Sequence, residues 1–136
     1  MKPVNHLAIV AAVVLHQALG FLWYGVLFFN PWLEGLGKTP TGINQSDPIP
    51  FILDIAGWFV ASYVIAWLIR KTNTASALQG ALLGAVLWLG LALPTLVPHY
   101  AFAGLQATVT VIDALNVLIA LVVTGAVLAA WQKPAA

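Results

Sequence analysis

The sequence has very little charge and no cysteine. Of its 136 residues, five are Lys or Arg and four are Asp or Glu, so charged side chains make up only 7%. An ordinary soluble domain carries roughly a quarter charged residues, and so few charges cannot cover a surface that faces water. The lack of cysteine excludes disulfides, thiolate metal sites and cysteine nucleophiles. The net charge of +1 predicts no nucleic-acid partner.

Long apolar runs take the place of the missing charge, since 62% of the residues are hydrophobic. Charges and prolines divide these runs into four spans, each near or above the roughly 20 residues that cross a bilayer. The spans cover about 4–29, 50–69, 75–97 and 105–131. The sequence therefore predicts an all-α fold. We expect residues 1–136 to form a single domain, an integral membrane bundle of four transmembrane helices in contact with the lipid bilayer.

The distribution of Lys and Arg predicts the orientation of this bundle. An even number of crossings puts both termini on the same side of the membrane. That side then carries Lys2, Arg70, Lys71 and Lys133, whereas the opposite side carries Lys38 alone. Cytoplasmic loops of membrane proteins are enriched in Lys and Arg. Both termini are therefore expected in the cytoplasm.

Aromatic residues gather where the spans are expected to leave the membrane. The run GFLWYGVLFFNPW places Trp23, Tyr24 and Trp32 near the outer boundary, where amphipathic rings prefer to lie. Pro31 in this run is expected to end the first helix. Trp67 and Trp131 are the matching anchors on the cytoplasmic side.

Prolines and short connections predict two further local features. Residues 30–50 are rich in Gly, Pro, Asn and Thr and are expected to form an exposed loop, while the tight connection at residues 70–74 makes spans two and three antiparallel neighbours. Pro94 and Pro98 should kink or end the third span near Leu93. Residues 95–104 would then run irregularly near the outer surface, as a simple helix end or as a mobile gate.

Small residues recur at four-residue spacing within the spans. Close packing of helices in lipid requires such residues along one face. The candidates are Gly57 and Ala61 on span two, Ser76, Gly80 and Gly84 on span three, and Gly125 and Ala129 on span four. They predict a compact bundle that also pairs with other copies or with a larger membrane complex.

Polar residues inside the spans are the candidate functional site. Asp113 lies about 12 Å into span four and His16 about 18 Å into span one from the opposite face, so both are expected near the middle of the bilayer. We predict an intramembrane cluster of His16, Gln17, Asp113 and Asn116. It would serve either as a proton or solute site or as a set of interhelical hydrogen bonds. Asp54, near the start of span two, is expected to cap its helix.

The positions of the three histidines limit the cofactors that the chain can bind, and the lack of catalytic motifs limits its possible enzymatic activity. His6, His16 and His99 are expected at three different depths, so two of them cannot ligate one haem iron within a monomer. No cofactor and no metal site are predicted, although a single axial bond from His16 to a haem or chlorophyll metal stays open. No hydrolase, metalloprotease or phosphate-binding motif occurs, and an enzyme is not expected.

Three motifs in order along the chain resemble the domain of unknown function 1761 family of small bacterial membrane proteins. They are Gly20-x-x-Trp23-Tyr24-x-x-Leu27-Phe28 with Trp32, Gly80-x-x-x-Gly84-x-x-x-Trp88-Leu89-Gly90, and Ile112-Asp113-Ala114. The resemblance implies a four-span bundle in the bacterial inner membrane and assigns no activity. Some members place a histidine four residues after the aspartate, where this chain has Val117, so the resemblance does not support a site built on that pair.

These observations favour a structural or accessory membrane component that acts as a homo-oligomer or as a subunit of a larger complex. The alternative is a small proton-linked transporter or channel that uses Asp113 and His16. An intramembrane enzyme is the third possibility, and it would need a water-lined cleft that reaches both of these residues.

Overall fold

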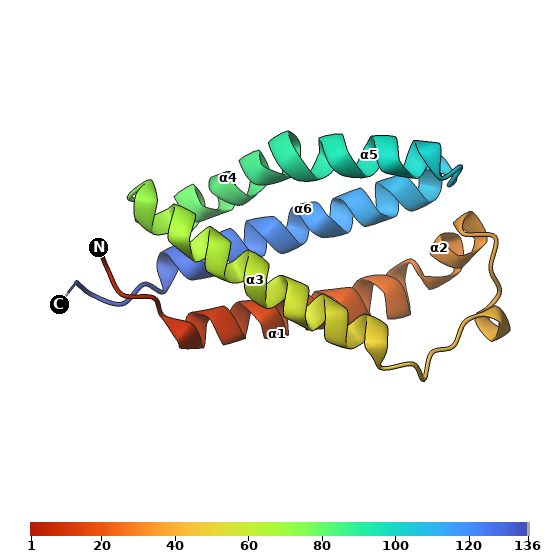
Figure 1. Cartoon of the computed structure of the whole chain (residues 1–136), viewed down its shortest axis with the longest axis horizontal. Helices are drawn as coiled ribbons and strands as arrows, with labels where there is room; N and C mark the ends of the chain where they lie inside the picture. Colours follow the sequence, from red (N-terminus) through yellow and green to blue (C-terminus); the bar gives the residue numbers. More distant parts are fainter. Residues whose placement is uncertain (136) are drawn as a thin grey trace.

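A computed structural model describes residues 1–135 of the chain, and within these residues all regular structure is helical (Figure 1). The helices are α1 (His6–Leu22), α2 (Phe29–Gly35), α3 (Ile49–Lys71), α4 (Ala77–Leu87), α5 (Leu93–Phe102) and α6 (Ala107–Ala130). Two π-helical turns, η1 (Trp23–Leu27) and η3 (Trp88–Ala92), extend α1 and join α4 to α5, and η2 (Pro40–Gly42) is a short 3₁₀ turn.

Four continuous helical segments are long and apolar enough to cross a membrane. They are His6–Leu27, Ile49–Lys71, Ala77–Phe102 and Ala107–Ala130, of 22, 23, 26 and 24 residues. At 1.5 Å per residue the shortest is about 33 Å long, which exceeds the roughly 30 Å of a hydrocarbon core. The prediction of an all-α fold with four membrane-spanning helices is therefore confirmed.

The other three segments pack around α6 (Figure 1). The α4–α5 segment runs along one side of α6 and α1 along the other, while α3 crosses α1 and α6 diagonally. Both chain termini lie at one end of the bundle, which we call the terminal end, and the connection between α2 and α3 lies at the opposite end, the loop end. The diagonal path of α3 moves its first half away from α5 and leaves much of that half exposed.

The apolar core lies toward the terminal end, where α1, α3 and α6 meet. Its buried members are Ala8, Ile9, Ala12, Ile65, Ala66, Ile69, Leu128 and Ala129. Ile9 and Ile69 are among the largest fully buried side chains. Because this core fills the terminal end, the polar side chains inside the bundle are confined to its middle and to its loop end.

The closest helix contact joins α4 and α6 through glycine. A Cβ atom at Gly80 would collide with the carbonyl oxygen of Gly125, and one at Gly84 would collide with that of Leu121. Backbones approach this closely only where side chains are absent, which is the role of small residues in helix packing within membranes. Ala129 lies at the same contact, beside Gly80.

Three expectations about packing differ from the structure. The short connection between α3 and α4 does not make them close neighbours, because α4 packs mainly on α6 and α3 crosses the bundle instead. Ser76 is the N-cap of α4, where its hydroxyl accepts a hydrogen bond from the amide of Gln79, and it is not a packing residue. Gly57 is exposed, with no atom within 4 Å of an added Cβ, whereas Ala61 is partly buried.

The third segment does not end near Leu93, and residues 95–102 are helical rather than irregular. Pro94 lies in the first turn of α5, directly after the π-helical turn η3, and Pro98 lies within α5. The hydroxyl of Thr95 donates to the carbonyl of Leu91. Prolines are tolerated in spanning helices with local π turns and Thr hydrogen bonds of this kind, and the helix continues to Phe102.

The first segment breaks before Pro31. The helical geometry is lost at Phe28, whose φ and ψ are −123° and 18°, after a π-helical bond from its amide to the carbonyl of Trp23. Pro31 then lies near the start of α2, where a proline is tolerated because amides of the first turn have no partner within the helix. The α2 helix packs on α6, where Gly35 faces Val109.

Candidate functional site

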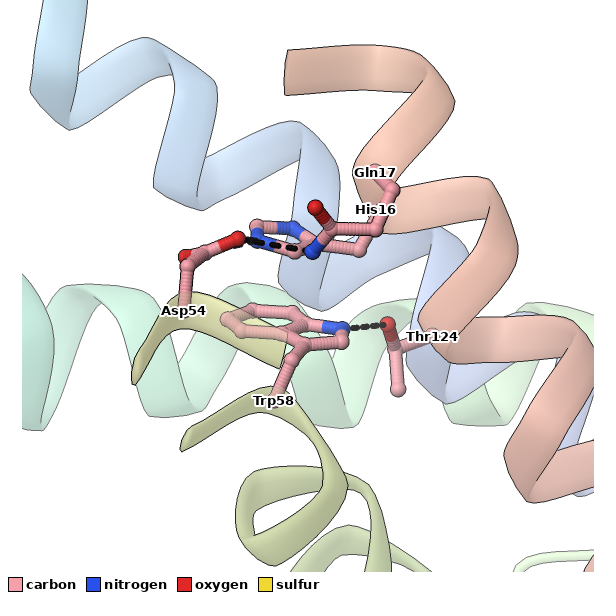
Figure 2. A network of polar contacts seen from close by, with 5 residues as sticks. All are labelled: His16, Gln17, Asp54, Trp58 and Thr124. Atoms are coloured by element: carbon pink, nitrogen blue, oxygen red, sulfur yellow. Dashed lines mark hydrogen bonds and ion pairs between the residues drawn. The ribbon is translucent and has the colours of Figure 1, made fainter. Parts of the chain in front are cut away.

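Two polar clusters lie inside the bundle, and the first joins α1 to α3. Nε2 of His16 lies 3.1 and 3.2 Å from the carboxylate oxygens of Asp54. The amide of Gln17 donates to the same carboxylate at 2.7 Å. Figure 2 shows these side chains pointing toward one another from the two helices. We call His16, Gln17, Asp54, Trp58 and Thr124 the His16 cluster.

Trp58 holds the imidazole of His16 in place from one side. The two rings stack with centroids 3.9 Å apart and planes 11° apart. The indole nitrogen of Trp58 donates to the hydroxyl oxygen of Thr124 on α6 at 3.2 Å, which ties α3 to α6 (Figure 2). The imidazole is therefore fixed at Nε2 by Asp54 and across one face by Trp58.

The two ring nitrogens of His16 have different surroundings. Nε2 faces the carboxylate of Asp54, which accepts hydrogen bonds when it is ionised. Nδ1 is buried and has no hydrogen-bond partner in the described chain. A single axial bond from His16 to a haem or chlorophyll metal stays a prediction.

Exposure within the His16 cluster is uneven. The His16 side chain is 9% exposed, whereas the Asp54 side chain is 51% exposed. Asp54 is the sixth residue of α3 and binds across to α1, so it does not cap its helix as expected. The carboxylate of Asp47 lies at that helix start instead, where it accepts a hydrogen bond from the amide of Ile49 at 3.0 Å.

The second cluster consists of Asp113, Tyr24 and Tyr100, which we call the Asp113 cluster. The hydroxyl of Tyr24 donates to Oδ1 of Asp113 at 2.6 Å, and the hydroxyl of Tyr100 donates to Oδ2 at 2.7 Å. Asp113 is 9% exposed. Its carboxyl group thus connects α6 to η1 and to α5, and both of its oxygens have donors.

Two tryptophans at the same end of the bundle donate hydrogen bonds to backbone carbonyls of α6. The indole of Trp23 donates to the carbonyl of Ile112 at 3.0 Å, and that of Trp88 donates to the carbonyl of Ala114 at 2.8 Å. Trp23 is only 8% exposed, so it is a packing residue and not the interface anchor that its position suggested. Its indole points into the bundle, where it reaches the backbone of α6.

The structure does not bring His16, Gln17, Asp113 and Asn116 into one cluster. His16 and Gln17 bind Asp54, while Asp113 binds tyrosines at the level of Tyr24. Tyr24 follows His16 by eight positions, which is about 12 Å along a helix. Asn116 is buried between these levels, and its Nδ2 has no partner among the described residues.

The partners that sequence reasoning missed are Asp54, Tyr24 and Tyr100. The position of Asp54 near the start of its helix predicts a cap. The position of Tyr24 among other aromatic residues predicts a boundary residue. For Asp54 and Tyr24, the available signal was a polar side chain inside a predicted span, since such groups find hydrogen-bond partners in lipid. Tyr100 gave no such signal, because it lies in the segment that was expected to be irregular.

The other expected anchors lie at the two ends of the bundle. Trp32 contacts the ring of Tyr24 with centroids 5.0 Å apart. Trp67 is 47% exposed, and Nζ of Lys71 lies 5.9 Å from the centroid of its ring. Trp131 is 46% exposed and accepts a hydrogen bond from Asn5 through its carbonyl. A position of these rings at a membrane boundary stays a prediction.

An apolar groove of about 270 Å³ lies between α1 and α6. Its walls include Leu19, Leu22, Ile119 and Val123, and His16 and Thr124 are its polar lining residues. Among the described residues, no group of three or more His, Cys, Asp or Glu side chains is placed to hold a metal ion.

The fold is a bundle of four helices that are long and apolar enough to cross a membrane. The family described as protein of unknown function (DUF1761) matches residues 7–129, which overlap all four spanning segments. The chain belongs to this family. Searches of curated proteins and of solved structures gave no match. The family describes no activity, so the function has to be argued from the two polar clusters and from the exposed surface.

Proposed function

We propose that this protein is a structural or accessory component of a membrane assembly, formed by its own copies or with other subunits. The observation that supports this proposal is the exposure of Asp54 within a spanning helix. Its carboxyl group lies about 7.5 Å from the first residue of α3, and half of its side chain surface is uncovered.

An exposed carboxylate is poorly suited to hydrocarbon. An ionised aspartate costs about 2.5–3.5 kcal/mol at the centre of a spanning helix and less toward its ends, so such groups face a partner or water. His16 and Gln17 contact Asp54 from α1 and leave its other side open. Around Asp54, the first half of α3 exposes large apolar side chains, namely Phe51, Ile52, Leu53 and Ile55. A protein partner on this face would cover both the carboxylate and these side chains.

The proposed location is the bacterial inner membrane, with both termini in the cytoplasm. The terminal end carries Lys2, Arg70 and Lys71, and Lys133 follows the end of α6. Lys38 is the basic residue of the connection between α2 and α3 at the loop end. This asymmetry supports a cytoplasmic terminal end, because Lys and Arg accumulate on that side.

The test is extraction in native lipid followed by mass measurement of the intact particles. We expect particles that contain more than one polypeptide. Asp54→Asn should lower the fraction of particles that contain more than one chain, because it removes the charge that a partner would cover. The variant keeps a hydrogen-bonding side chain beside His16 and Gln17. Asp47→Asn, which alters the loop carboxylate at the start of α3, is the matched control and should leave assembly unchanged. Particles with a single wild-type chain in native lipid would contradict the proposal.

A small proton-linked transporter or channel is the second candidate function. The observation that favours it is the contact between the titratable side chains of His16 and Asp54 inside a spanning region. Asp113, which was expected to act with His16, lies at the level of Tyr24 instead. In the revised form of this hypothesis, the proton is exchanged between His16 and Asp54, and Asp113 holds the loop end of the bundle.

Proton flux into reconstituted vesicles tests this candidate. His16→Gln and Asp54→Asn should each abolish pH-driven flux, since neither replacement exchanges a proton near neutral pH. Asp47→Asn should retain wild-type flux. Equal flux in wild-type vesicles, in both cluster variants and in protein-free vesicles would exclude the transport function while leaving the assembly proposal intact.

A further inference from the structure

We propose that the terminal end of the bundle binds the phosphate group of an anionic membrane lipid through Arg70 and Lys2. This site lies within one chain, so it goes beyond the proposed function and does not depend on assembly. Three observations support it: the charge of the terminal end, the contacts of Arg70, and the level of the site in the bundle.

The terminal end carries basic side chains without acidic ones. Its basic residues lie at or beyond the ends of helices and are Lys2, Arg70, Lys71 and Lys133. The acidic residues of the chain lie elsewhere and are Glu34, Asp47, Asp54 and Asp113. Asp54 is on the same helix as Arg70 but precedes it by sixteen positions, about 24 Å along the axis. Salt at 0.1 M screens exposed charges beyond roughly 10 Å, so this carboxylate does not neutralise the terminal end.

Arg70 has donors that its own chain does not use. Its Nη1 donates to the carbonyl of Lys2 at 3.2 Å. Its Nε is buried and has no hydrogen-bond partner among residues 1–135. A guanidinium has five N–H donors and no acceptor, and it binds phosphate oxygens in pairs. Arg70 therefore keeps donors for an anionic group.

Residues 1–5 hold Lys2 beside Arg70. The side-chain amide of Asn5 donates to the carbonyl of Trp131 at 2.9 Å, which ties this segment to the end of α6. A recess of about 20 Å³ lies between this segment, the end of α3 and the chain after α6. A water molecule needs about 10–15 Å³ of such space, so the recess takes one water and is too small for a phosphate. The phosphate therefore lies on the outer side of Arg70, which is partly exposed.

The site lies where two spanning helices end. Arg70 is the second-last residue of α3, and α6 ends at Ala130. On the membrane side of Arg70, α3 exposes Val60, Val64 and Trp67, which follow one another at four- and three-residue spacing and so share one face. Acyl chains can cover this stripe while the headgroup reaches Arg70. Basic pockets at this level between spanning helices bind lipid headgroups, which favours a lipid over free phosphate.

Native mass spectrometry of the purified full chain tests this site. The chain in detergent is mixed with phosphatidylglycerol, which is anionic, or with phosphatidylcholine that carries the same acyl chains. We expect the wild type to retain the anionic lipid at least about fivefold better, the ratio that corresponds to one basic residue near an anionic surface. Equal retention of the two lipids would overturn the proposal.

Four variants separate a defined site from diffuse attraction. Arg70→Gln and Lys2→Gln should each lower the retention of phosphatidylglycerol about fivefold. Lys2→Gln keeps the backbone carbonyl that Arg70 binds, so it removes charge without removing that contact. The controls are Lys38→Gln at the loop end and Lys71→Gln, whose Nζ lies 5.9 Å from the ring centroid of Trp67, and both should retain nearly the wild-type amount. Equal losses in all four variants, or no loss in Arg70→Gln and Lys2→Gln, would overturn the site.

Competition with inorganic phosphate distinguishes the two sources of a phosphate group. An excess of inorganic phosphate should displace no more phosphatidylglycerol than sodium chloride of equal ionic strength, because the acyl chains also contact α3. Displacement by inorganic phosphate alone would identify free phosphate as the ligand and overturn the assignment to a lipid.

Discussion

At the scale of single residues, Asp113 links three segments through two tyrosine hydroxyls at 2.6 and 2.7 Å. Each of its oxygens has a donor, so the carboxyl group is satisfied within the protein although it lies inside a spanning helix. Polar hydrogen bonds between helices in a bilayer contribute about 0.6 kcal/mol on average and up to about 1.7 kcal/mol. We interpret the Asp113 cluster as a structural tie of the loop end.

Removing either hydroxyl tests this interpretation. Tyr24→Phe and Tyr100→Phe should each lower the free energy of unfolding by about 0.6–1.7 kcal/mol, because each leaves one oxygen of Asp113 without its donor. The measurement is thermal or denaturant unfolding in detergent, with circular dichroism as the signal. Tyr63→Phe, which removes an exposed contact of 2.8 Å with His6, should have a smaller effect. Unfolding midpoints equal to wild type for both cluster variants would show that the tie does not stabilise the fold.

At the scale of helices, the contact of α4 with α6 depends on the absence of side chains. Gly80 and Gly125 face each other so closely that a Cβ on either would meet the carbonyl oxygen of the other. The obstacle is backbone on both sides, so it cannot move aside as a flexible side chain would. The α4–α6 pair is therefore the part of the bundle most sensitive to added volume.

A single methyl group tests this sensitivity. Gly80→Ala should lower the free energy of unfolding by about 1–3 kcal/mol, the usual range for overpacking, despite the better helix propensity of alanine. Gly20→Ala is the matched control, because it adds the same methyl group to α1 where no atom lies within 4 Å. It should be neutral or stabilising by up to about 1 kcal/mol. Equal stability of the two variants would show that α4 and α6 separate at little cost.

At the scale of the whole molecule, four spanning helices bring both termini to one end of the bundle (Figure 1). The connection between α2 and α3 lies at the other end. A molecule of this shape in a bilayer exposes its termini on one side and residues 36–48 on the opposite side. The excess of Lys and Arg at the terminal end predicts that this side is cytoplasmic.

Labelling of single cysteines with a membrane-impermeant maleimide measures this orientation. Lys38→Cys should be labelled in intact cells, whereas Lys2→Cys and Lys133→Cys should be labelled only after the membrane is permeabilised. The native chain provides an unlabelled background, since it has no cysteine. Labelling of Lys2→Cys and Lys133→Cys from opposite sides of the membrane would contradict an even number of crossings.

The sequence by itself determined the helical class, the number of spans and their approximate positions. These properties depend on local composition and length, because any run of about 20 apolar residues must satisfy its backbone as a helix in lipid. The glycines at positions 80, 84 and 125 also marked the helices that approach closely, although the sequence did not pair α4 with α6.

Only the tertiary structure decided which polar groups meet. Asp54 pairs with His16, and Asp113 pairs with Tyr24 and Tyr100, although the sequence placed His16 and Asp113 at the same depth. Hydrogen-bond partners depend on the offset and crossing of helices to within a few ångströms, and the π-helical turns and the diagonal path of α3 alter both. Local sequence patterns contain no measure of these offsets, which arise when all four helices pack together.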